Sequence, residues 1–593
     1  SHPFGNPQAG WEPVPREAVA DWYYDYYAVP NEFNGGQTLH GYWMEDSHGK
    51  IGVDVQVFGP YLLPGKLHEY GIPDGGFNAP AAAYCPQGDS CNKSLRTDGG
   101  ALWRADLGGC TGLCGFDNGF YVTAGHDESS TWQEFGEMMF QTRDEIPDAF
   151  GPPRNPDGSA PLNQLGQPMP NWADTRYVDW TSWKAAANHW PNAGGGTSTQ
   201  AESSGLSVFA HEFSHLRGLP DNYNNPFADN ERNFTGYWEM MSRGTFNGPG
   251  GTHNRWQVPN QGGSALGPHH MLHFKNQLGV LAATDQTTFA RDTLQTQGVA
   301  VVDVKAREAV PDGDLAGFTV TLGTGDLAGT CANQGYTDVF YCPNRTGGPY
   351  LHYRIEVVDR VGNDSFTPGH GVLLSKSRNG GTPRVWLIDP NPQDIGMIDF
   401  YRPDGTPVPV VRGDPRQLND ATFHAGTRSG SEYEYRDTFN KLQFYVLGSS
   451  RDDDGVLHYR VAVRRFDSGD PFARGVAVAN PTKIPQRQGF LATCSVPLTN
   501  TGQAGAVPFD SDVYRVAATS SSADWKVTLP NALAAAKAGE TVPVPVHVLR
   551  DPLTDEGDAR TIVTLTAASE SDASKTATRT CNVHVRDTAP ATG

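Results

Sequence analysis

The strongest chemical signal in the chain is a His-Glu-x-x-His motif. His211 and His215 are four residues apart, so on a helix they project from one face, one turn apart. Imidazole nitrogens in that arrangement can bind one zinc ion, with Glu212 beside them as a general base. Gly218 permits the left-handed turn that ends a helix, and this turn would bring Asp221 back as a third, oxygen ligand. Three protein ligands leave a fourth position open for water, as in catalytic zinc sites.

The element that must hold these ligands is predicted to be a buried helix. Ser203 or Ser204 is expected to cap its start, and Pro220 prevents its continuation. The alternative is a pair of surface or core histidines without a metal, which would not explain the turn and the carboxylate that follow at this spacing. We therefore favour a metal site. The predicted helix takes its apolar surface from Leu206, Val208, Phe209, Phe213 and Leu216.

This motif and its surroundings resemble a known family. The run His-Glu-Phe-Ser-His-Leu-Arg-Gly-Leu-Pro-Asp at 211–221 is similar to the extended zinc motif of the immune inhibitor A family of secreted bacterial metalloproteases, the M6 peptidases. These proteases resemble metzincins, which carry a methionine in a tight turn beneath the zinc, and Met241 is the matching methionine here. The similarity covers most of residues 37–380 and is strongest from 205 to 281. Segment 268–281 resembles the helix that follows in the family, and segments 353–356 and 368–374 resemble its next β segments.

The resemblance implies a secreted endopeptidase with His211, His215 and Asp221 on zinc and Glu212 as the base. It also implies calcium as a stabilising ion. Ser214 is a departure, because relatives usually carry glycine there. Two further points stay open. Relatives often carry histidine where Thr123 stands, and Asn222, Asn224 and Asp229 lie near the third ligand. Tyr223 and Tyr237 are candidates for oxyanion stabilisation by position alone.

Length and composition narrow the class of protein. The 593 residues predict several domains, and 68 glycines and 44 prolines beside 10% aromatic residues indicate a loop-rich globular chain. A formal charge of −21 argues against a nucleic-acid or anionic-membrane partner. No apolar run is long enough to span a bilayer. The sequence starts without a charged-then-apolar leader, so we expect that any signal peptide or pro-segment has been removed or was absent. A monomer is expected.

The eight cysteines favour disulfides in an oxidising compartment. No pair has the Cys-x-x-Cys spacing of a zinc knuckle, and buried free thiols are the alternative. The long-range pair would join the first and last strands of a C-terminal domain. By proximity the pairs are Cys85 with Cys91, Cys110 with Cys114, Cys331 with Cys342, and Cys494 with Cys581.

The predicted fold class is multidomain α+β, with a metzincin-like zinc protease domain followed by β-sandwich domains. Residues 1–290 would form the catalytic domain with its N-terminal arm, whose aromatic cluster at 22–27 is expected to pack rather than to bind a ligand. Strands are expected at 39–43 and 51–58. Residues 295–480 would form a β-sandwich, and residues 485–593 an immunoglobulin-like module.

Three hypotheses for function follow from these observations. The first is a secreted, extracellular zinc endopeptidase of bacterial origin that acts on proteins or peptides. The second is a secreted binding protein for glycans or cell walls, with a vestigial zinc site and contacts made by the C-terminal module. The third is a zinc amidase. The intact Glu212 argues against the second, and the Gly-x-x-Asp continuation favours an endopeptidase over the third. The clusters Asp312–Asp314 and Asp452–Gly455 could bind calcium or be solvated turns.

Overall fold

The computed structural model divides the chain into two compact units. Residues 1–280 with 361–367 form one unit, and residues 281–360 with 368–593 form the other. Within the described part of the chain, no helix is both long and apolar enough to cross a membrane. The structure describes residues 14–32, 34–70, 81–123, 140–173, 181–183, 192–201, 205–223, 235–248, 265–328, 350–385, 387–413, 415–467, 469, 471–485, 491–550 and 559–588.

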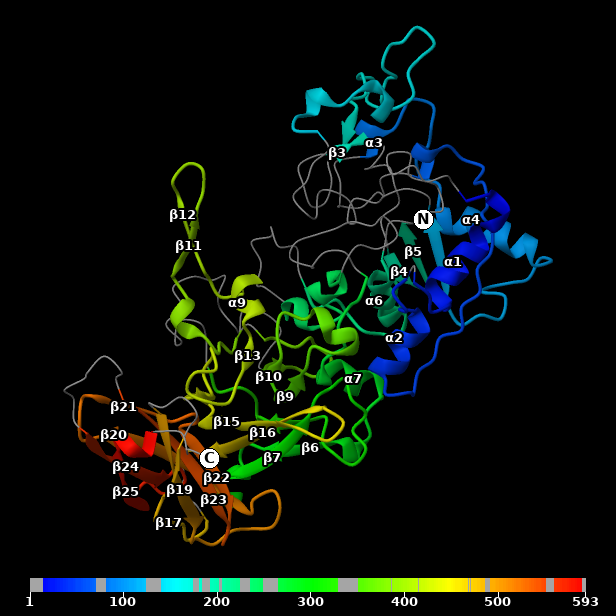
Figure 1. The fold of residues 1–593 in the computed structure, drawn as a ribbon. Helices are drawn as coiled ribbons and strands as arrows, with labels where there is room; N and C mark the ends of the chain where they lie inside the picture. The colour runs from blue at the N-terminus through cyan, green and yellow to red at the C-terminus, as the bar shows by residue number, and fades with distance from the viewer. Residues whose placement is uncertain are drawn as a thin grey trace. The chain divides into compact units, whose positions relative to one another are not determined.

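The described part of the first unit consists of helices, a three-stranded sheet and a pair of short strands (Figure 1). In the sheet the central strand β5 pairs in parallel with β1 and antiparallel with β4. A second pair of short strands, β2 and β3, is antiparallel. The helices are α1 (Val19–Ala28), α2 (Leu39–Asp46), α3 (Ala81–Tyr84), α4 (Leu95–Asp106), α6 (Leu206–Leu216) and α7 (Leu272–Leu278). The strands are β1 (Gly119–Thr123), β2 (Trp172–Ala173), β3 (Thr181–Ser182), β4 (Asn192–Gly194) and β5 (Thr197–Ala201).

The core of the first unit lies where α1, α2 and α6 meet. The ring of Tyr27 lies 4.4 Å from that of Phe209, which joins α1 to α6. The rings of Trp43 and Phe213 are 5.2 Å apart and join α2 to α6. Burial of such large aromatic side chains stabilises the folded state by excluding apolar surface from water. The N-terminal aromatic cluster therefore packs, as predicted, and the structure shows that its partner is the helix that carries the His-Glu-x-x-His motif.

Two strand predictions in this unit are wrong. Residues 39–43 lie in helix α2, because Thr38 caps its start by accepting a hydrogen bond from the Gly41 backbone at 2.9 Å. Residues 51–58 form no strand and pair with no strand among the described residues. Their alternating side chains, including Ile51 and Val53, instead lie partly buried against the helical core.

The second unit contains two sheets on a shared hydrophobic core, followed by two more sheets. One sheet has the order β13-β10-β9-β8-β6, and the other has the order β14-β15-β16-β7. Apolar residues from both sheets form one buried cluster. The strands are β6 (Gln286–Ala290), β7 (Ala300–Lys305), β8 (Gly317–Thr321), β9 (His352–Val358), β10 (Gly371–Ser377), β13 (Thr422–Phe423), β14 (Glu434–Asp437), β15 (Leu442–Arg451) and β16 (Leu457–Arg465). Shorter elements are α8 (Leu294–Gln297), α9 (Pro415–Asn419), β11 (Ile398–Tyr401) and β12 (Pro407–Pro409).

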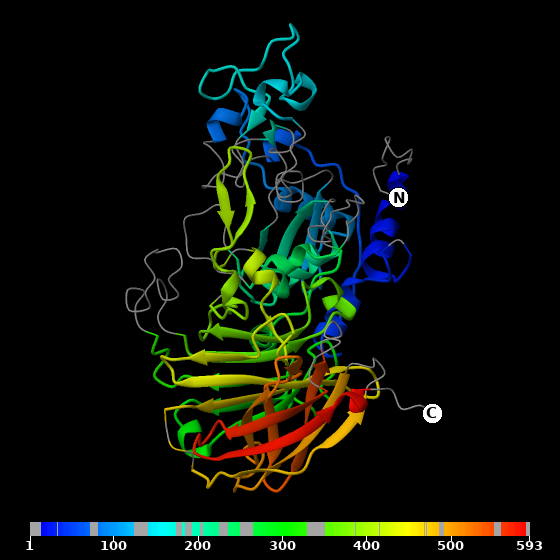
Figure 2. The same cartoon turned by 60° about the vertical axis from the view of Figure 1, so that its left-hand side comes forward.

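The last two sheets enclose a core of their own, and Figure 2 shows their orange and red strands beside the yellow and green strands of the preceding pair. One sheet has the order β17-β19-β23-β21, with β18 also pairing with β19, and the other has the order β22-β20-β24-β25. The strands are β17 (Val476–Val478), β18 (Thr482–Pro485), β19 (Leu491–Asn500), β20 (Ser511–Ser520), β21 (Trp525–Thr528), β22 (Leu533–Lys537), β23 (Thr541–Arg550), β24 (Arg560–Ser569) and β25 (Thr576–His584).

Three of the four predicted disulfides are confirmed. The structure contains Cys85–Cys91, Cys110–Cys114 and Cys494–Cys581. The last of these joins β19 to β25 and so links the two C-terminal sheets. The predicted pair Cys331–Cys342 lies outside the described residues.

Candidate metal centre

Helix α6 begins and ends where its sequence permits. It starts after its N-cap residue Gly205, and the predicted caps Ser203 and Ser204 lie outside the described residues. At the other end the backbone N–H of Leu219 donates to the carbonyl of Ser214 at 3.1 Å. Gly218 between them has φ +91°, a left-handed conformation that glycine adopts without strain. The predicted turn is therefore present, and it directs the chain back toward the helix.

The turn brings three potential ligands together. The Nε2 atoms of His211 and His215 each lie 3.1 Å from Oδ1 of Asp221. Among the described residues this is the one group of histidine, cysteine and acidic side chains whose ligand atoms converge, all within 4.8 Å. Tetrahedral zinc with bonds of about 2.1 Å needs neighbouring ligand atoms about 3.4 Å apart. The donor set and its spacing therefore fit zinc with little rearrangement.

Backbone carbonyls orient both imidazoles. Nδ1 of His211 lies 2.9 Å from the carbonyl oxygen of Met240, and Nδ1 of His215 lies 2.8 Å from that of Leu219. A carbonyl can only accept, so each Nδ1 must carry its proton and donate it. Each Nε2 is then available to a metal, and the bond on the far side fixes the direction of the ring.

Without a metal, hydrogen bonds between the histidine ligands and Asp221 shift the pKa values of His215 and Asp221. Burial lowers the pKa of His215, but the hydrogen bond and charge of Asp221 outweigh it and raise that pKa to about 9. Burial likewise raises the pKa of Asp221, but hydrogen bonds from His211 and His215 hold it well below its usual range. Such a site binds a proton where a metal cation would otherwise sit, so metal and proton compete for it.

The candidate base lies on the flank of α6 that faces β5. Ser198 Oγ donates to Glu212 Oε2 at 3.5 Å, and Gln200 Nε2 donates to Ser198 Oγ at 2.9 Å. The charge of Glu212 also acts on Arg96, whose pKa burial lowers overall. Sequence reasoning missed Ser198, Gln200 and Arg96, because their relation to Glu212 arises only when β5 and α4 pack near the helix.

The segment around Met241 makes backbone contacts with His211 and with the residue after Asp221. Met240 and Met241 are fully buried. Met240 provides the carbonyl that orients His211, while the carbonyl of Met241 accepts a hydrogen bond from the Asn222 backbone at 2.7 Å. Asn222 follows the carboxylate ligand directly, so the methionine segment fixes both sides of the ligand set.

The residues considered for oxyanion stabilisation, and those left open near the third ligand and in β1, lie at different distances from the site. The ring of Tyr223 lies 6.0 Å from that of His211, so it is close to the ligands. The side chain of Asn222 donates to Thr235 at 3.0 Å and is fully buried. Thr123 lies at the end of β1. Tyr237 lies in the segment leading to Met241, and Asn224 and Asp229 fall outside the described residues.

The acidic clusters considered for calcium make bonds within the protein. Asp314 lies 3.3 Å from Nζ of Lys305. Asp452 accepts from the backbone of Asp454 and Val456 at 3.0 and 2.9 Å, and its other oxygen lies 3.1 Å from His458. These contacts are those of ordinary turn carboxylates, and calcium binding stays a prediction.

Ser214 makes the backbone contact that its position suggested. Its Oγ donates to the carbonyl of Ala210 at 2.7 Å, one turn earlier in α6. The same oxygen lies 3.0 Å from Nε2 of His270. His270 belongs to the predicted helix at 268–281, of which only Leu272–Leu278 is helical. Sequence analysis gave no indication of the contact between these two residues.

Three regions of the chain match models of known protein families. Residues 184–265 match the model of the immune inhibitor A peptidase M6 catalytic domain, and residues 475–586 match a peptidase M6-like domain. Residues 277–466 match a model described as a middle domain. The catalytic-domain match includes all three candidate ligands and Glu212.

A full-length relative supports this assignment. A protein of the fungus Arthroderma benhamiae, described as a "Putative secreted metallopeptidase", is 47% identical over 98% of this chain and 84% of its own length. The predicted bacterial origin is therefore not supported. A solved structure of a FixG-related protein from Vibrio parahaemolyticus covers 19% of this chain and 95% of its own, at 14% identity and a TM-score of 0.15, a likeness that carries no argument. On the relative and the catalytic-domain match, this chain belongs to the M6-like family of metallopeptidases.

Proposed function

We propose that this metallopeptidase is a secreted, zinc-dependent endopeptidase that hydrolyses peptide bonds in protein substrates. The observation that carries the proposal is the convergence of His211, His215 and Asp221 at 3.1 Å spacing, with Glu212 on the same helix. Secretion is supported by the description of the fungal relative and by the three disulfides.

The proposed chemistry assigns one task to each residue. Zinc, when bound, would polarise the scissile carbonyl and lower the pKa of a water from about 15.7 toward 7. His211 and His215 would donate Nε2 to the metal while their Nδ1 protons stay on backbone carbonyls. Glu212 would take the proton of the attacking water on its carboxylate and deliver it to the leaving amine nitrogen. Ser198 would hold that carboxylate in place.

The fold assignment is part of the proposal. We infer a metzincin-like catalytic domain over residues 1–290, a β-sandwich over 295–480 and an immunoglobulin-like module over 485–593. The matches at 277–466 and 475–586 support boundaries close to these. The shared core of the two middle sheets and the disulfide between the two last sheets support the sandwich assignments.

Metal analysis combined with a protease assay tests the proposal. The protein and a Glu212→Ala variant would be analysed for zinc and incubated with unfolded casein. We expect one zinc per chain in both and cleavage by the parent alone, abolished by a chelator. Zinc in the parent without cleavage of casein or other unfolded proteins would contradict an endopeptidase of broad specificity and favour an amidase. The absence of zinc after resupply would contradict the catalytic proposal and favour a binding protein.

A further inference from the structure

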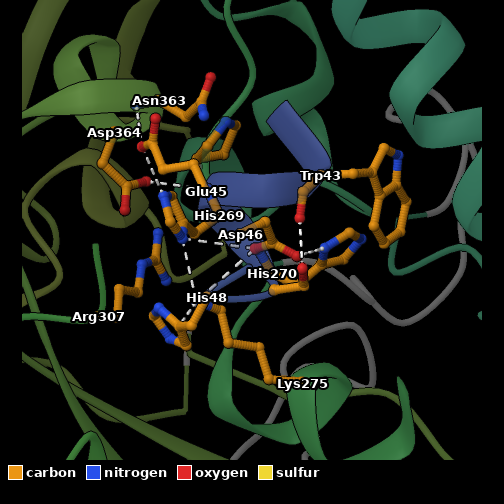
Figure 3. A network of polar contacts seen from close by, with 12 residues as sticks. Trp43, Glu45, Asp46, His48, His269, His270, Lys275, Arg307, Asn363 and Asp364 are labelled. Atoms are coloured by element: carbon orange, nitrogen blue, oxygen red, sulfur yellow. Dashed lines mark hydrogen bonds and ion pairs between the residues drawn. The ribbon is translucent and has the colours of Figure 1, made fainter. Parts of the chain in front are cut away.

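Three buried side chains form a continuous polar chain from helix α2 to the metal-binding helix. Oδ2 of Asp46 lies 2.7 Å from Nδ1 of His270, and Oδ1 accepts the His270 backbone N–H at 2.8 Å. On the other side of the ring, Nε2 lies 3.0 Å from Oγ of Ser214 in α6. All three residues are completely buried. Figure 3 shows Asp46 and His270 within the surrounding network.

The hydrogen bonds of Ser214 and Asp46 define the contacts of His270. Ser214 has one hydroxyl hydrogen and donates it to the carbonyl of Ala210 at 2.7 Å. Nε2 of His270 must therefore donate to Ser214. Burial raises the pKa of Asp46, but the charges of His270 and Lys275 outweigh it and hold that pKa far below the usual range. Nδ1 of His270 faces this carboxylate at 2.7 Å, so the ring bridges Asp46 and Ser214.

The neighbouring histidine has a different arrangement. Nζ of Lys275 lies 3.0 Å from Nδ1 of His269 and donates to it, since an ammonium group can only donate. Nε2 of His269 lies 2.9 Å from Oε1 of Glu45 and is the donor of that pair. These contacts join His269 to α2 and α7, and its Nδ1 also lies 3.5 Å from Oδ1 of Asp46. It provides a matched control for His270 within the same buried cluster.

The position of Ser214 on α6 explains how its contact with His270 can affect the metal ligands. With 100° between successive residues, Ser214 lies about 60° to one side of His211, and Glu212 lies about 100° to the other. The Ser214–His270 contact and the Ser198–Glu212 contact thus hold α6 on opposite flanks of its ligand face. A rotation of the helix by about 10° would move a ligand nitrogen by roughly 1 Å, which is well outside the tolerance of about 0.2 Å for zinc bonds.

We propose that Asp46, His270 and Ser214 are positioning residues that set the rotation of α6 about its axis, and so place the metal ligands and the base for the reaction. The inference rests on the proposed zinc site. It also gives a reason for a serine at 214: the hydroxyl provides a buried hydrogen-bond partner for Nε2 of His270, which glycine would not provide.

Two variants separate positioning from general stability. Ser214→Ala removes the contact between His270 and α6, whereas His269→Gln keeps a donor toward Glu45 and leaves α6 untouched. For Ser214→Ala we expect zinc affinity, measured by competition with a chelator, to fall about 10-fold, as outer-shell changes typically cause. We also expect kcat on a peptide substrate to fall about 10-fold with KM within about 2-fold, since the change affects placement of the reacting groups. His269→Gln should lower Tm while leaving zinc affinity and kcat near those of the parent.

A second substitution covers the case in which Ser214→Ala does not fold. Asp46→Asn keeps the shape of the side chain but removes the charge that holds His270, so it should weaken zinc affinity in the same direction. The inference is wrong if Ser214→Ala and Asp46→Asn lower Tm alone, or if His269→Gln weakens zinc affinity equally. A parent protein that binds no zinc would instead overturn the proposed function, and this inference with it.

Discussion

His211 and Met240 are joined by a 2.9 Å contact between the imidazole Nδ1 and a backbone carbonyl oxygen. The next residue, Met241, accepts a hydrogen bond at 2.7 Å from the backbone of Asn222, beside the third ligand. Two ligands that are ten residues apart are therefore positioned by one buried segment. A site held in this way before metal binding loses little conformational entropy on binding, which favours tight association.

Replacing the base should separate chemistry from metal binding. Glu212→Gln keeps the size of the side chain and its contact with Ser198, but the amide cannot take a proton at neutral pH. We expect kcat to fall by about 10²–10⁴-fold while zinc content stays at one per chain. Peptidase kinetics with metal analysis on the same preparation would check this. Residual activity above a tenth of the parent would show that another group is the base.

Replacing the carboxylate ligand should affect the metal first. Asp221→Asn removes the negative charge that the 3.1 Å contacts place between the two imidazoles. We expect zinc affinity to fall by at least 10-fold, with activity restored in part by excess zinc. A competition titration with a chelator measures this. Equal affinity in parent and variant would mean that Asp221 is not a ligand.

Metal removal should destabilise the protein. A ligand that binds the folded state alone stabilises it by RT ln(1 + [L]/Kd), or about 4 kcal/mol at a thousand times Kd. We expect chelation to lower the unfolding temperature of the unit that contains α6 and to leave a transition of the β-sheet unit unchanged. Calorimetry with and without chelator, on the parent and on His211→Ala, would show the difference, since the variant should no longer respond to chelation.

The sequence predicted the local parts of this site and not the distant ones. The helix and the left-handed turn at Gly218 depend on residues within about ten positions of each other, so periodicity and turn chemistry reveal them. Asp46 and His270 are 224 residues apart, and no local pattern records such a contact. Ser198 and Glu212 likewise meet only through the packing of β5 on α6.

The two wrong strand predictions also arise because packing between distant residues is not visible in a local pattern. Residues 39–43 contain aromatic side chains that favour strands, but capping by Thr38 and packing of Trp43 against Phe213 stabilise a helix. Residues 51–58 alternate as a strand would, because a segment packed on a helical core can also bury every second side chain. In the second unit the predicted β-structure is found, since sheets with a shared core bury the alternating residues that define strands.

Acid should destabilise the first unit through His48. Burial, with the charge of Lys275 next, lowers the pKa of His48 to about 3, below the value of about 6.5 expected in the unfolded chain. The unfolded state therefore binds more protons below pH 6.5, so stability is lost as pH falls from there. The loss is at most about 1.4 kcal/mol at pH 5.5.

The variant His48→Asn tests this, because asparagine tolerates the φ of +54° at this position. The difference in unfolding free energy between pH 8 and pH 5.5, from urea titrations, should be smaller in the variant by up to that amount. An unchanged difference would show that His48 does not contribute to the acid sensitivity.

A buried lysine in the second unit should be critical for its stability. Nζ of Lys376 lies 2.8 Å from Asp326 and 3.4 Å from Asp437. Burial lowers the pKa of Lys376, but the charge of Asp437 outweighs it and raises that pKa, so the ammonium form persists. Lys376→Met would leave two buried carboxylates without their cation, which typically costs about 3–5 kcal/mol.

Lys537→Met is the matched control, because its contact with Asp510 is largely exposed and should contribute at most about 1 kcal/mol. Urea unfolding of both variants measures the two costs, and similar values would contradict the role of the buried cluster.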